Sequence, residues 1–520
     1  MAFGAGAVAG AGCGALQLLL WPQVPPTLAR AALATLAWGS WGALWLGGLG
    51  FLLGEGVRAF LRPWRSRRRQ ALPRLMAAAG FGVAAIALLN AKDARELIPA
   101  ANRQGLEVVA AFAALWGIAW LVLAGRRARR WVAAGLFGVW LAGIWWPWWG
   151  ARQQEAAAAP PPALELPLRP RKALVVVWEG ADLPWLLPLQ DRGVMPFLQS
   201  LWARGSWGQL RTVRPFSRAA SLTTLATGCS PVLHGTLGRR AYRLRFLGEE
   251  PVSLLLKGPW PSPHQLPWKL WRRAAPPPPR EPLLWEVLER WGTSCAVVGW
   301  PLVFQLGPGR ESLLPEEGLE LDPVWEKALE EATAARPERL AATRRAFRLA
   351  AAAGVRAAVA ARSAGSGVLV VHLELGNRLR PAWSEDDPGG VLELAAQFLD
   401  AQLAELWRVF GEDDAYLVVV SPYGLAPPGP WDRLLANLGL GGRFRVSPKD
   451  SPDGFLFLLG PGVARGGRVR GARVSDLLPT LMYLLELPVS RKLSGRVLLG
   501  AVDEAWAASV PLRLIPSYGQ

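Results

Sequence analysis

The chain has 520 residues, of which 51% are hydrophobic, and a formal net charge of +18. This length allows two or more domains, and so apolar a composition is typical of a protein that lies partly in a membrane. The charge is concentrated, because residues 1–150 carry 14 Arg and one Lys against four acidic residues. Its position beside apolar segments excludes nucleic acid as the expected partner and predicts membrane topology instead.

Five apolar stretches of membrane-spanning length lie in the first 150 residues. Each is close to the ~20 residues that a helix needs to cross a bilayer, and the rest of the chain has no comparable run. The first stretch lacks a charged n-region and a cleavage site, so we expect a retained helix rather than a removed signal peptide. The predicted spans are 1–21, 31–54, 72–90, 106–125 and 131–149.

Two short arginine-rich loops between these stretches predict their orientation. The positive-inside rule places both loops in the cytoplasm, with the N-terminus inside and everything after residue 150 outside. Four tryptophans at the end of the fifth stretch suit the outer membrane–water interface. The arginines are Arg58, Arg62, Arg65, Arg67, Arg68, Arg69, Arg74, Arg126, Arg127, Arg129 and Arg130, and the tryptophans are Trp145, Trp146, Trp148 and Trp149. We therefore expect a multi-pass cytoplasmic-membrane protein with a periplasmic or extracellular C-terminal domain.

The rest of the chain is organised as a linker and an exported domain. An Ala/Pro-rich segment at 151–163 predicts an extended tether to a domain at 164–515. A proline-rich segment at 259–282 is expected to be a surface excursion without helix or strand. Cys229 and Cys295 allow one disulfide, although we expect two free thiols. The Arg-rich, Lys-poor composition suggests a bacterium with GC-rich DNA.

Apolar strand patterns alternate with helical patterns in the exported domain. This alternation predicts an α/β/α domain with a mostly parallel sheet, whose ligand site lies beyond the carboxyl ends of the strands. Glu179 and residues 421–424 are expected at that edge. The predicted strands are 172–178, 295–299, 367–373, 415–420 and 454–459, and the predicted helices are 195–204, 283–291, 323–361, 389–410 and 475–486.

Several short motifs carry a family resemblance. They are Glu-Gly at 179–180, Met-Pro-Phe-Leu at 195–198, Pro-Phe-Ser at 215–217 and Thr-Gly-Cys-Ser-Pro-Val-Leu-His-Gly at 227–235. In this order they resemble the first half of a type I phosphodiesterase/nucleotide pyrophosphatase domain of the alkaline phosphatase superfamily, and the resemblance extends over 164–500. It implies an alkaline phosphatase-like fold, two divalent ions held mostly by Asp and His, and a Thr or Ser nucleophile.

Most positions that the resemblance assigns to metal ligands hold other residues. Glu179 stands in the place of the first Asp, and Asp450 in the place of the last His. An Asp-x-x-x-His pair corresponds to Gly376 and Arg380, and a Ser-Asp-His-Gly signature reads Ser-Pro-Tyr-Gly at 421–424. Glu179 and Asp450 are therefore the expected metal ligands if the chain holds metal at all.

The nucleophile position is also changed. Counting back ten residues from Gly228 gives Arg218, and Ser217 lies one residue earlier. Ser217 could be the nucleophile if the loop carries one extra residue, or it could be the N-cap of a helix that begins there. The sequence leaves both alternatives open.

The histidine supply argues against a two-zinc centre independently of the resemblance. The chain has only His234, His264 and His372, and we expect His372 to be packed within its strand. These residues cannot supply the imidazole ligands of two zinc ions. The sequence therefore predicts a metal-free pseudoenzyme without a cofactor, whereas an active enzyme would need two zinc or manganese ions.

Three functions from different classes remain. The first is a binding or scaffolding protein of the cell envelope that binds an anionic phosphorylated or sulfated ligand. Its former cleft is expected to be lined by Glu179, Ser217, Arg218, Arg380 and Tyr423, with Arg218, Arg380 and Tyr423 as the ligand-binding residues. The second is an active phosphodiesterase, phosphatase or lipid-headgroup phosphotransferase. The third is a structural subunit of an envelope complex, because five membrane helices exceed what tethering requires. The lipid bilayer is an expected partner in each case.

Overall fold

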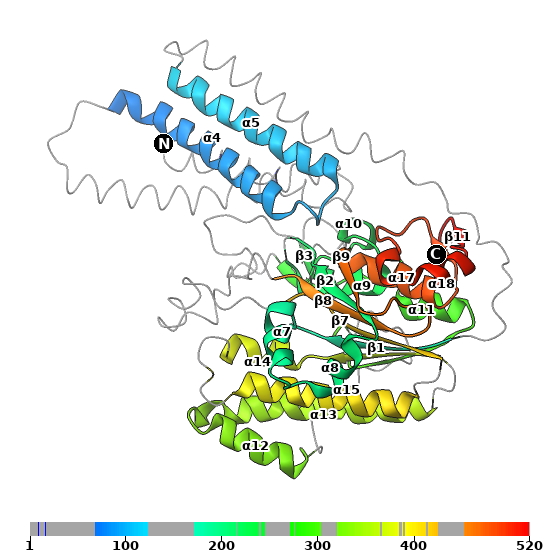
Figure 1. Cartoon of the computed structure of the whole chain (residues 1–520). Helices are drawn as coiled ribbons and strands as arrows, with labels where there is room; N and C mark the ends of the chain where they lie inside the picture. The colour runs from blue at the N-terminus through cyan, green and yellow to red at the C-terminus, as the bar shows by residue number, and fades with distance from the viewer. Residues whose placement is uncertain are drawn as a thin grey trace. The chain divides into compact units, whose positions relative to one another are not determined.

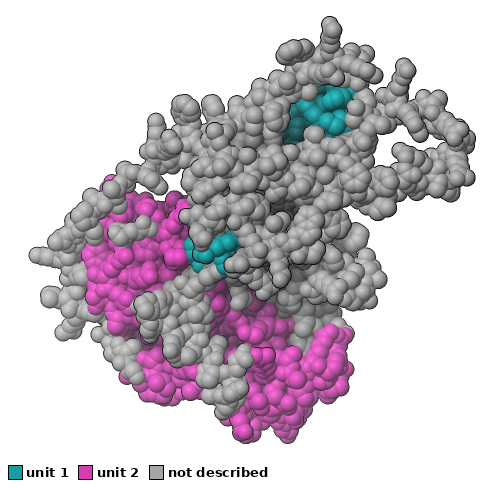
Figure 2. Space-filling model, turned by 180° about the vertical axis from the view of Figure 1, so that it is seen from behind, with its two compact units in different colours: residues 1–157, 235–277 teal, residues 158–234, 278–520 magenta. Residues whose placement is uncertain are grey.

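The computed structural model describes residues 9, 16, 68–122, 171–214, 216–238, 241–244, 271–274, 276–302, 320–363, 367–383, 387, 390–411, 414–424 and 452–518. Three predicted spans, 1–21 apart from residues 9 and 16, 31–54 and 131–149, lie outside these ranges, as do the linker and Asp450. Contacts divide the chain into two compact units (Figure 2). Unit 1 is 1–157 with 235–277, and unit 2 is 158–234 with 278–520. The predicted domain limits stay a prediction.

In unit 1, helices α4 (Arg68–Asp93) and α5 (Ala100–Val122) pack along each other (Figure 1). A Cβ added at Gly80 would lie 2.7 Å from the carbonyl oxygen of Ala113, so the small residue permits the close approach. Among the described helices, α5 alone is long and apolar enough to cross a membrane, and Met76–Lys92 is a shorter apolar helix. The third predicted span, 72–90, and residues 106–122 of the fourth are therefore helical, but the described residues do not confirm a five-helix bundle.

Unit 1 also contains a two-stranded sheet. Strand β3 (Ala241–Leu244) pairs antiparallel with β4 (Trp271–Ala274). The prediction of no strand in the proline-rich segment 259–282 is wrong for β4. Pairing with β3 satisfies the backbone of this strand, and the surrounding prolines obscured it in the sequence.

Unit 2 is built on a seven-stranded sheet with the order β5-β6-β1-β7-β8-β2-β9. All neighbours are parallel except β8, which is antiparallel to both β7 and β2. The Val-rich strands β6 and β7 are buried along their whole length and β1 along almost all of it, as expected where helices cover both faces. The prediction of a mostly parallel sheet is confirmed. The bounds are β1 (Lys172–Trp178), β2 (Ser206–Arg211), β5 (Ser294–Val298), β6 (Gly367–Leu373), β7 (Ala415–Ser421), β8 (Gly454–Leu459) and β9 (Gly467–Arg473).

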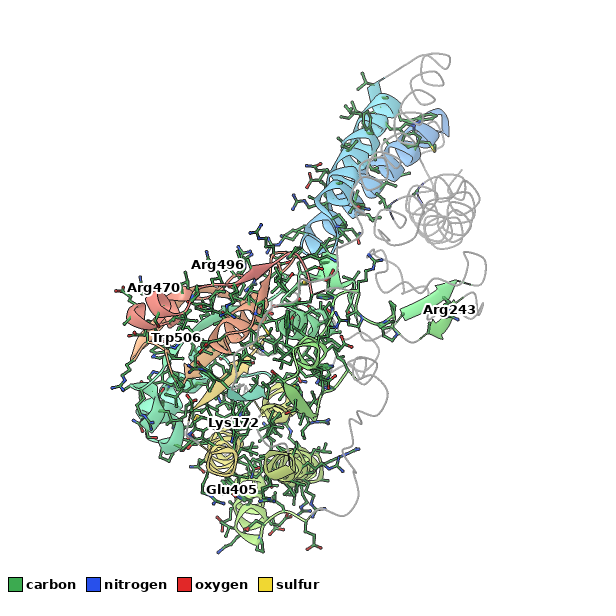
Figure 3. All side chains as sticks on the ribbon, turned by 90° about the vertical axis from the view of Figure 1, so that its right-hand side faces the viewer. Lys172, Arg243, Glu405, Arg470, Arg496 and Trp506 are labelled. Carbon is green, nitrogen blue, oxygen red and sulfur yellow. The ribbon has the colours of Figure 1, made fainter. Side chains whose placement is uncertain are left out.

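Helices form a layer on each face of this sheet (Figure 1). Successive residues of β1 point to opposite faces, so that Val175 belongs to one core and Val176 to the other. In the first layer, Trp506, labelled in Figure 3, packs edge-on against Tyr483 with ring centroids 5.3 Å apart. The first layer contains α9 (Arg218–Thr227), α11 (Leu284–Arg290), α17 (Leu477–Leu484) and α18 (Glu504–Ser509). The second contains α7 (Leu183–Asp191), α8 (Pro196–Trp202), α12 (Pro323–Thr333), α13 (Leu340–Ser363), α14 (Leu375–Trp383) and α15 (Val391–Phe410).

Unit 2 also contains the short helix α10 (Pro231–His234), the parallel strands β10 (Val489–Ser490) and β11 (Leu514–Ile515), and the 3-10 helices η5 (Val474–Asp476) and η6 (Leu499–Ala501). The prediction of one helix over 323–361 is wrong, because α12 and α13 are separated by a turn and a 3-10 helix at Pro337–Arg339. Pro337 lacks a backbone donor and restricts the residue before it. Cys229 is buried, Cys295 is partly buried, and both thiols are free.

Candidate functional site

The site lies where three parallel strands end. Strands β1 and β6 are neighbours, and Trp178 is paired with Leu373, so Glu179 and Glu374 are the next residues on adjacent strands. The backbone N–H of Glu179 donates to the carbonyl of Leu373 at 3.0 Å. On the other side of β1, the turn after β7 forms a bridge between Gly424 and the residue after Glu179. This confirms the predicted meeting of Glu179 and residues 421–424 at the carboxyl edge.

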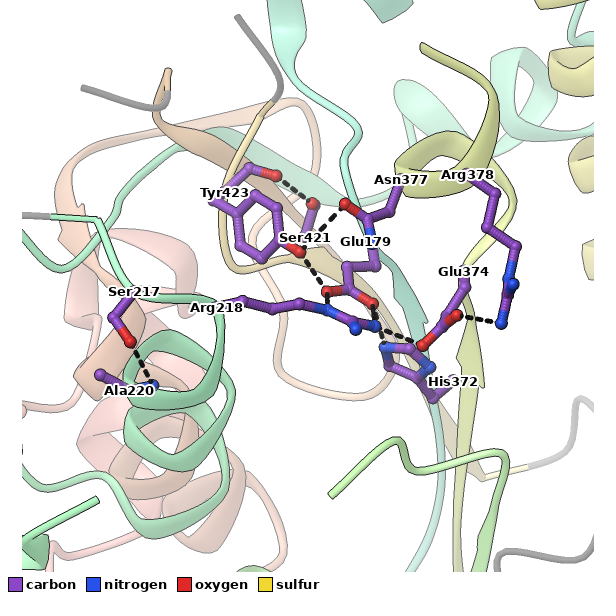
Figure 4. Close-up of polar contacts among 10 residues, drawn as sticks. All are labelled: Glu179, Ser217, Arg218, Ala220, His372, Glu374, Asn377, Arg378, Ser421 and Tyr423. Atoms are coloured by element: carbon purple, nitrogen blue, oxygen red, sulfur yellow. Dashed lines mark hydrogen bonds and ion pairs between the residues drawn. The ribbon is translucent and has the colours of Figure 1, made fainter. Parts of the chain in front are cut away.

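The carboxylate of Glu179 is buried and is contacted by three side chains (Figure 4). Arg218 donates to both carboxylate oxygens, at 2.6 Å from Nη2 to Oε2, and the hydroxyl of Tyr423 donates to Oε1. Nε2 of His372 lies 2.9 Å from Oε2. Burial alone would raise the pKa of Glu179, but the hydrogen bonds and the charge of Arg218, together with the nearby imidazole of His372, outweigh it and hold that pKa below its usual range. Glu179 is therefore a stable buried anion.

Arg218 joins two carboxylates. Its guanidinium is largely buried and pairs with Glu179, which follows β1, and with Glu374, which follows β6. Arg378 on α14 binds the other oxygen of Glu374 at 2.7 Å. Burial would lower the pKa of Arg218, but the adjacent carboxylates of Glu179 and Glu374 raise it above its ordinary value. The guanidinium is thus a permanent cation between the ends of two strands.

Tyr423 closes the opposite side of the cluster. Its side chain is fully buried, its ring packs edge-on against Phe216 at 4.6 Å, and its hydroxyl lies 3.4 Å from Oδ1 of Asn377. Ser421 holds the turn by donating its hydroxyl hydrogen to the carbonyl of Tyr423 at 2.7 Å. Burial and the charge of Glu179 raise the pKa of Tyr423 well above 10, so the phenol remains a donor.

Ser217 is the N-cap of α9. Its backbone is extended, with φ of −141°, and its Oγ accepts a hydrogen bond from the N–H of Ala220 at 3.4 Å. The capping alternative from the sequence is therefore present in the fold, and the nucleophile alternative stays a prediction. The cap also begins the helix at Arg218, whose side chain points to Glu179 (Figure 4).

Gly376 stands in a position where the resemblance expects a metal ligand. A Cβ added there would lie 2.9 Å from the carbonyl oxygen of Glu179, which also accepts the N–H of Asn377 at 3.0 Å. A ligating side chain would therefore require the backbone to shift. Arg380 lies in α14, although its side chain is outside what the structure describes, and Asp450 lies outside the described residues.

The structure brings together Glu179, Arg218 and Tyr423, which the sequence predicted as cleft residues. It adds four residues that the sequence did not assign to the cleft: one in β6, one directly after β6 and two in α14. For Glu374 the sequence offered one signal, because this residue directly follows the predicted strand 367–373 and sites in such sheets lie beyond the carboxyl ends of the strands. The four residues are His372, Glu374, Asn377 and Arg378.

One group among the described residues has the chemistry of a metal site. Ligand atoms of Glu179, His372 and Glu374 all lie within 4.8 Å of one another. A pair of metal ions requires more ligands than these three residues supply, and Arg218 already pairs with both carboxylates. The described residues therefore do not fit a two-metal centre.

Comparison with known proteins supports the family resemblance. Residues 187–437 match the family model described as type I phosphodiesterase/nucleotide pyrophosphatase, so the resemblance predicted from the motifs is confirmed over this range. A search of curated proteins found no match.

Three solved structures illustrate the similarity. The alkaline phosphatase PafA is 11% identical, over 65% of this chain and 100% of that chain, with a TM-score of 0.43. Inactive murine ectonucleotide pyrophosphatase/phosphodiesterase 5 in complex with AMP is 14% identical, over 61% and 95%, with a TM-score of 0.36. The lipoteichoic acid synthase LtaP from Listeria monocytogenes is 12% identical, over 64% and 75%, with a TM-score of 0.34.

Proposed function

We propose that the chain is a membrane-anchored protein whose exported domain keeps a phosphodiesterase-like scaffold without metal-dependent catalysis and acts by binding or scaffolding in the cell envelope. The observation that carries this proposal is the state of Glu179. This residue replaces the first metal ligand of the resembling family, and Arg218, His372 and Tyr423 all contact its carboxylate. Both carboxylate oxygens of Glu179 are thus occupied by side chains of the same domain.

The neighbouring substitutions favour the same conclusion. Gly376 packs against the carbonyl of Glu179, where a ligating side chain would not fit without a backbone shift. Tyr423 occupies a former ligand position and instead donates to Glu179. Two-metal hydrolysis depends on ions that stabilise both the attacking and the leaving oxygen. The described cluster supplies the guanidinium of Arg218, but it has no ligands for a second metal ion.

The anchoring part of the proposal rests on the first 150 residues. Helix α5 is long and apolar enough to cross a bilayer, and the arginine-rich loops predict a cytoplasmic N-terminus with the domain outside. Reporter fusions test this topology. A reporter that is active only outside the cytoplasm should be active when fused after residue 163. The same reporter should be inactive when fused in the loop around residue 67.

The ligand of the domain is proposed to be an anionic phosphorylated or sulfated envelope component. Arg218 is committed to two carboxylates, so an incoming oxyanion would have to compete with them. Arg378 has 41% of its side chain exposed and offers guanidinium donors beside Glu374. Calorimetry of the full-length protein with a sulfated glycan tests this. We expect binding that weakens in Arg378→Ala, and no binding to any sulfated or phosphorylated glycan would contradict it.

Turnover assays test the catalytic part of the proposal. The full-length protein in detergent is incubated with phosphodiester, phosphomonoester and sulfate-ester substrates, with zinc or manganese added. We expect no turnover above that of a Ser217→Ala variant, which loses the candidate nucleophile. Metal-dependent turnover that disappears in Ser217→Ala would overturn the proposal and establish an active hydrolase or phosphotransferase.

A further inference from the structure

The cluster around Glu179 has the composition of a metal site with a guanidinium inside it. Two carboxylates and one imidazole converge, with ligand atoms within 4.8 Å of one another. Arg218 reaches both carboxylates, through Nε and Nη2 to Glu179 and through Nη2 to Glu374 (Figure 4). The same oxygen lone pairs that would bind a metal ion are thus bonded to N–H groups.

The chemistry of these donors explains why a cation must be present. Glu179 is fully buried and Glu374 largely so, and two neighbouring buried carboxylates are unfavourable unless a positive charge compensates them. Carboxylate and imidazole donors suit zinc, whereas a planar guanidinium suits two carboxylates through its fork of N–H groups. A divalent ion and the Arg218 guanidinium would therefore bind the same carboxylate oxygens of Glu179 and Glu374, so only one of them can be present.

This donor set differs from the one that the family resemblance implies. Glu179 is shared, but the other resembling positions hold Gly376, Arg380, Pro422 and Tyr423. His372 lies near the end of β6 instead, and Glu374 is the first residue after that strand. Both ring nitrogens of His372 are buried, and among the described residues neither has a hydrogen-bond partner, although Nε2 lies 2.9 Å from Oε2 of Glu179.

We infer that Arg218 is the resident cation of this site, that it excludes a divalent ion from the native chain, and that Glu179, His372 and Glu374 form a single-metal site once its guanidinium is removed. This inference rests on the proposed metal-free state and adds a cause for it. Ser217 contributes indirectly, because the cap that it forms starts α9 at Arg218.

Removing the guanidinium tests the inference. The full-length protein and its variants are stripped with chelator, dialysed against zinc in detergent, and analysed for bound metal and for Tm with and without zinc. Arg218→Ala should bind about one zinc per chain, and its Tm should rise by roughly 5 °C at a hundred-fold excess of zinc over its Kd. The native chain should bind no zinc and keep its Tm.

Two further variants assign the effect to these residues. Arg378→Ala removes a guanidinium that pairs with Glu374 and not with Glu179 among the described contacts, so it should remain without zinc. Arg218→Ala combined with His372→Ala should lose the zinc that Arg218→Ala gains. Zinc that stays in the double variant would show that His372 is not a ligand and would contradict the proposed site.

Arg218→Ala leaves a buried anion without its partner, so its folding is checked first by circular dichroism in zinc and in chelator. Arg218→His is tested beside it, because an imidazole can hydrogen-bond Glu179 and can also ligate zinc. A folded variant that binds no zinc would overturn the inference, as would failure of both variants to fold even with zinc present. Neither result would restore catalysis, so the proposed function is tested separately by turnover of the native chain.

Discussion

The hydroxyl of Tyr423 donates a hydrogen bond to the buried carboxylate of Glu179, and this bond joins the turn after β7 to the end of β1. Both residues occupy positions where the family resemblance places metal ligands. Tyr423 stands in one former ligand position and donates its hydrogen bond to a carboxylate oxygen of Glu179, which stands in another. The contact is consistent with a cluster that is stabilised by protein groups alone.

Removing this hydroxyl should destabilise the exported domain. Tyr423→Phe leaves a buried carboxylate with one donor fewer, and we expect the free energy of unfolding to fall by about 1–3 kcal/mol. Urea unfolding of the full-length protein, followed by near-ultraviolet circular dichroism, measures the change. Tyr416→Phe is the matched control, because the Tyr416 hydroxyl meets only a longer 3.3 Å contact from Arg171. Equal losses in both variants would argue against a special role of the Tyr423 contact.

His234 should make stability depend on pH. It is fully buried, its Nε2 lies 3.0 Å from the hydroxyl of Thr224, and burial lowers its pKa to about 3. The unfolded chain takes up this proton at pH ~6.5, so stability is complete above that pH and is lost as the pH falls toward the folded pKa. Between pH 6.5 and 5 the native chain should lose about 2 kcal/mol more than His234→Gln. Parallel pH profiles for the two proteins would contradict this.

Asp400 should be a strong stabilising residue although it lies far in sequence from the helix that it caps. Its carboxylate, on α15, accepts the N–H groups of Phe197 and Leu198 at 2.9 and 2.8 Å, at the start of α8. Asp400→Ala should lower the free energy of unfolding by about 2 kcal/mol, because one buried donor and one partly buried donor lose their acceptor. Urea unfolding provides the measurement.

An exposed cap of the same type provides the comparison. Asp503 accepts the N–H groups of Ala505 and Trp506 at 3.0 and 3.1 Å at the surface. Water can replace this acceptor, so Asp503→Ala should lower the free energy of unfolding by about 1 kcal/mol or less. A loss equal to that of Asp400→Ala would show that burial does not set the difference.

The two described thiols should be unreactive in the folded protein. Burial raises the pKa of both Cys229 and Cys295 to about 12, so the thiolate population at pH 8 is roughly a thousand-fold below that of a free thiol. In a Cys13→Ser background, iodoacetamide should label neither residue until guanidinium chloride is added. Mass spectrometry of the peptides measures the labelling, and fast modification of native Cys229 would contradict the burial.

Much of the sheet could be predicted from the sequence because its central strands are continuous apolar runs. The ranges 172–178, 367–373 and 454–459 match β1, β6 and β8. Strand β9 was missed because three arginines and two glycines interrupt its seven residues, so its apolar pattern is weak. Pairing with β2 at the sheet edge places it in the sheet nonetheless. Tertiary context outweighed local propensity there.

The site could be predicted only in part. Glu179, Arg218 and Tyr423 were found because their motifs lie at the expected strand and helix ends. Glu374 was not, because its role depends on β6 lying beside β1 in a register that sequence spacing does not reveal. His372 was expected to be packed in its strand; it is buried there and also lies 2.9 Å from Glu179.

The metal content of the native chain tests the account most directly. The full-length protein is purified in detergent without chelator, and zinc and manganese are counted by elemental mass spectrometry. The account predicts much less than one ion per chain, because Arg218 pairs with both carboxylates of the cluster. About two ions per chain would contradict it and would mean that ligands beyond the described cluster complete a catalytic centre.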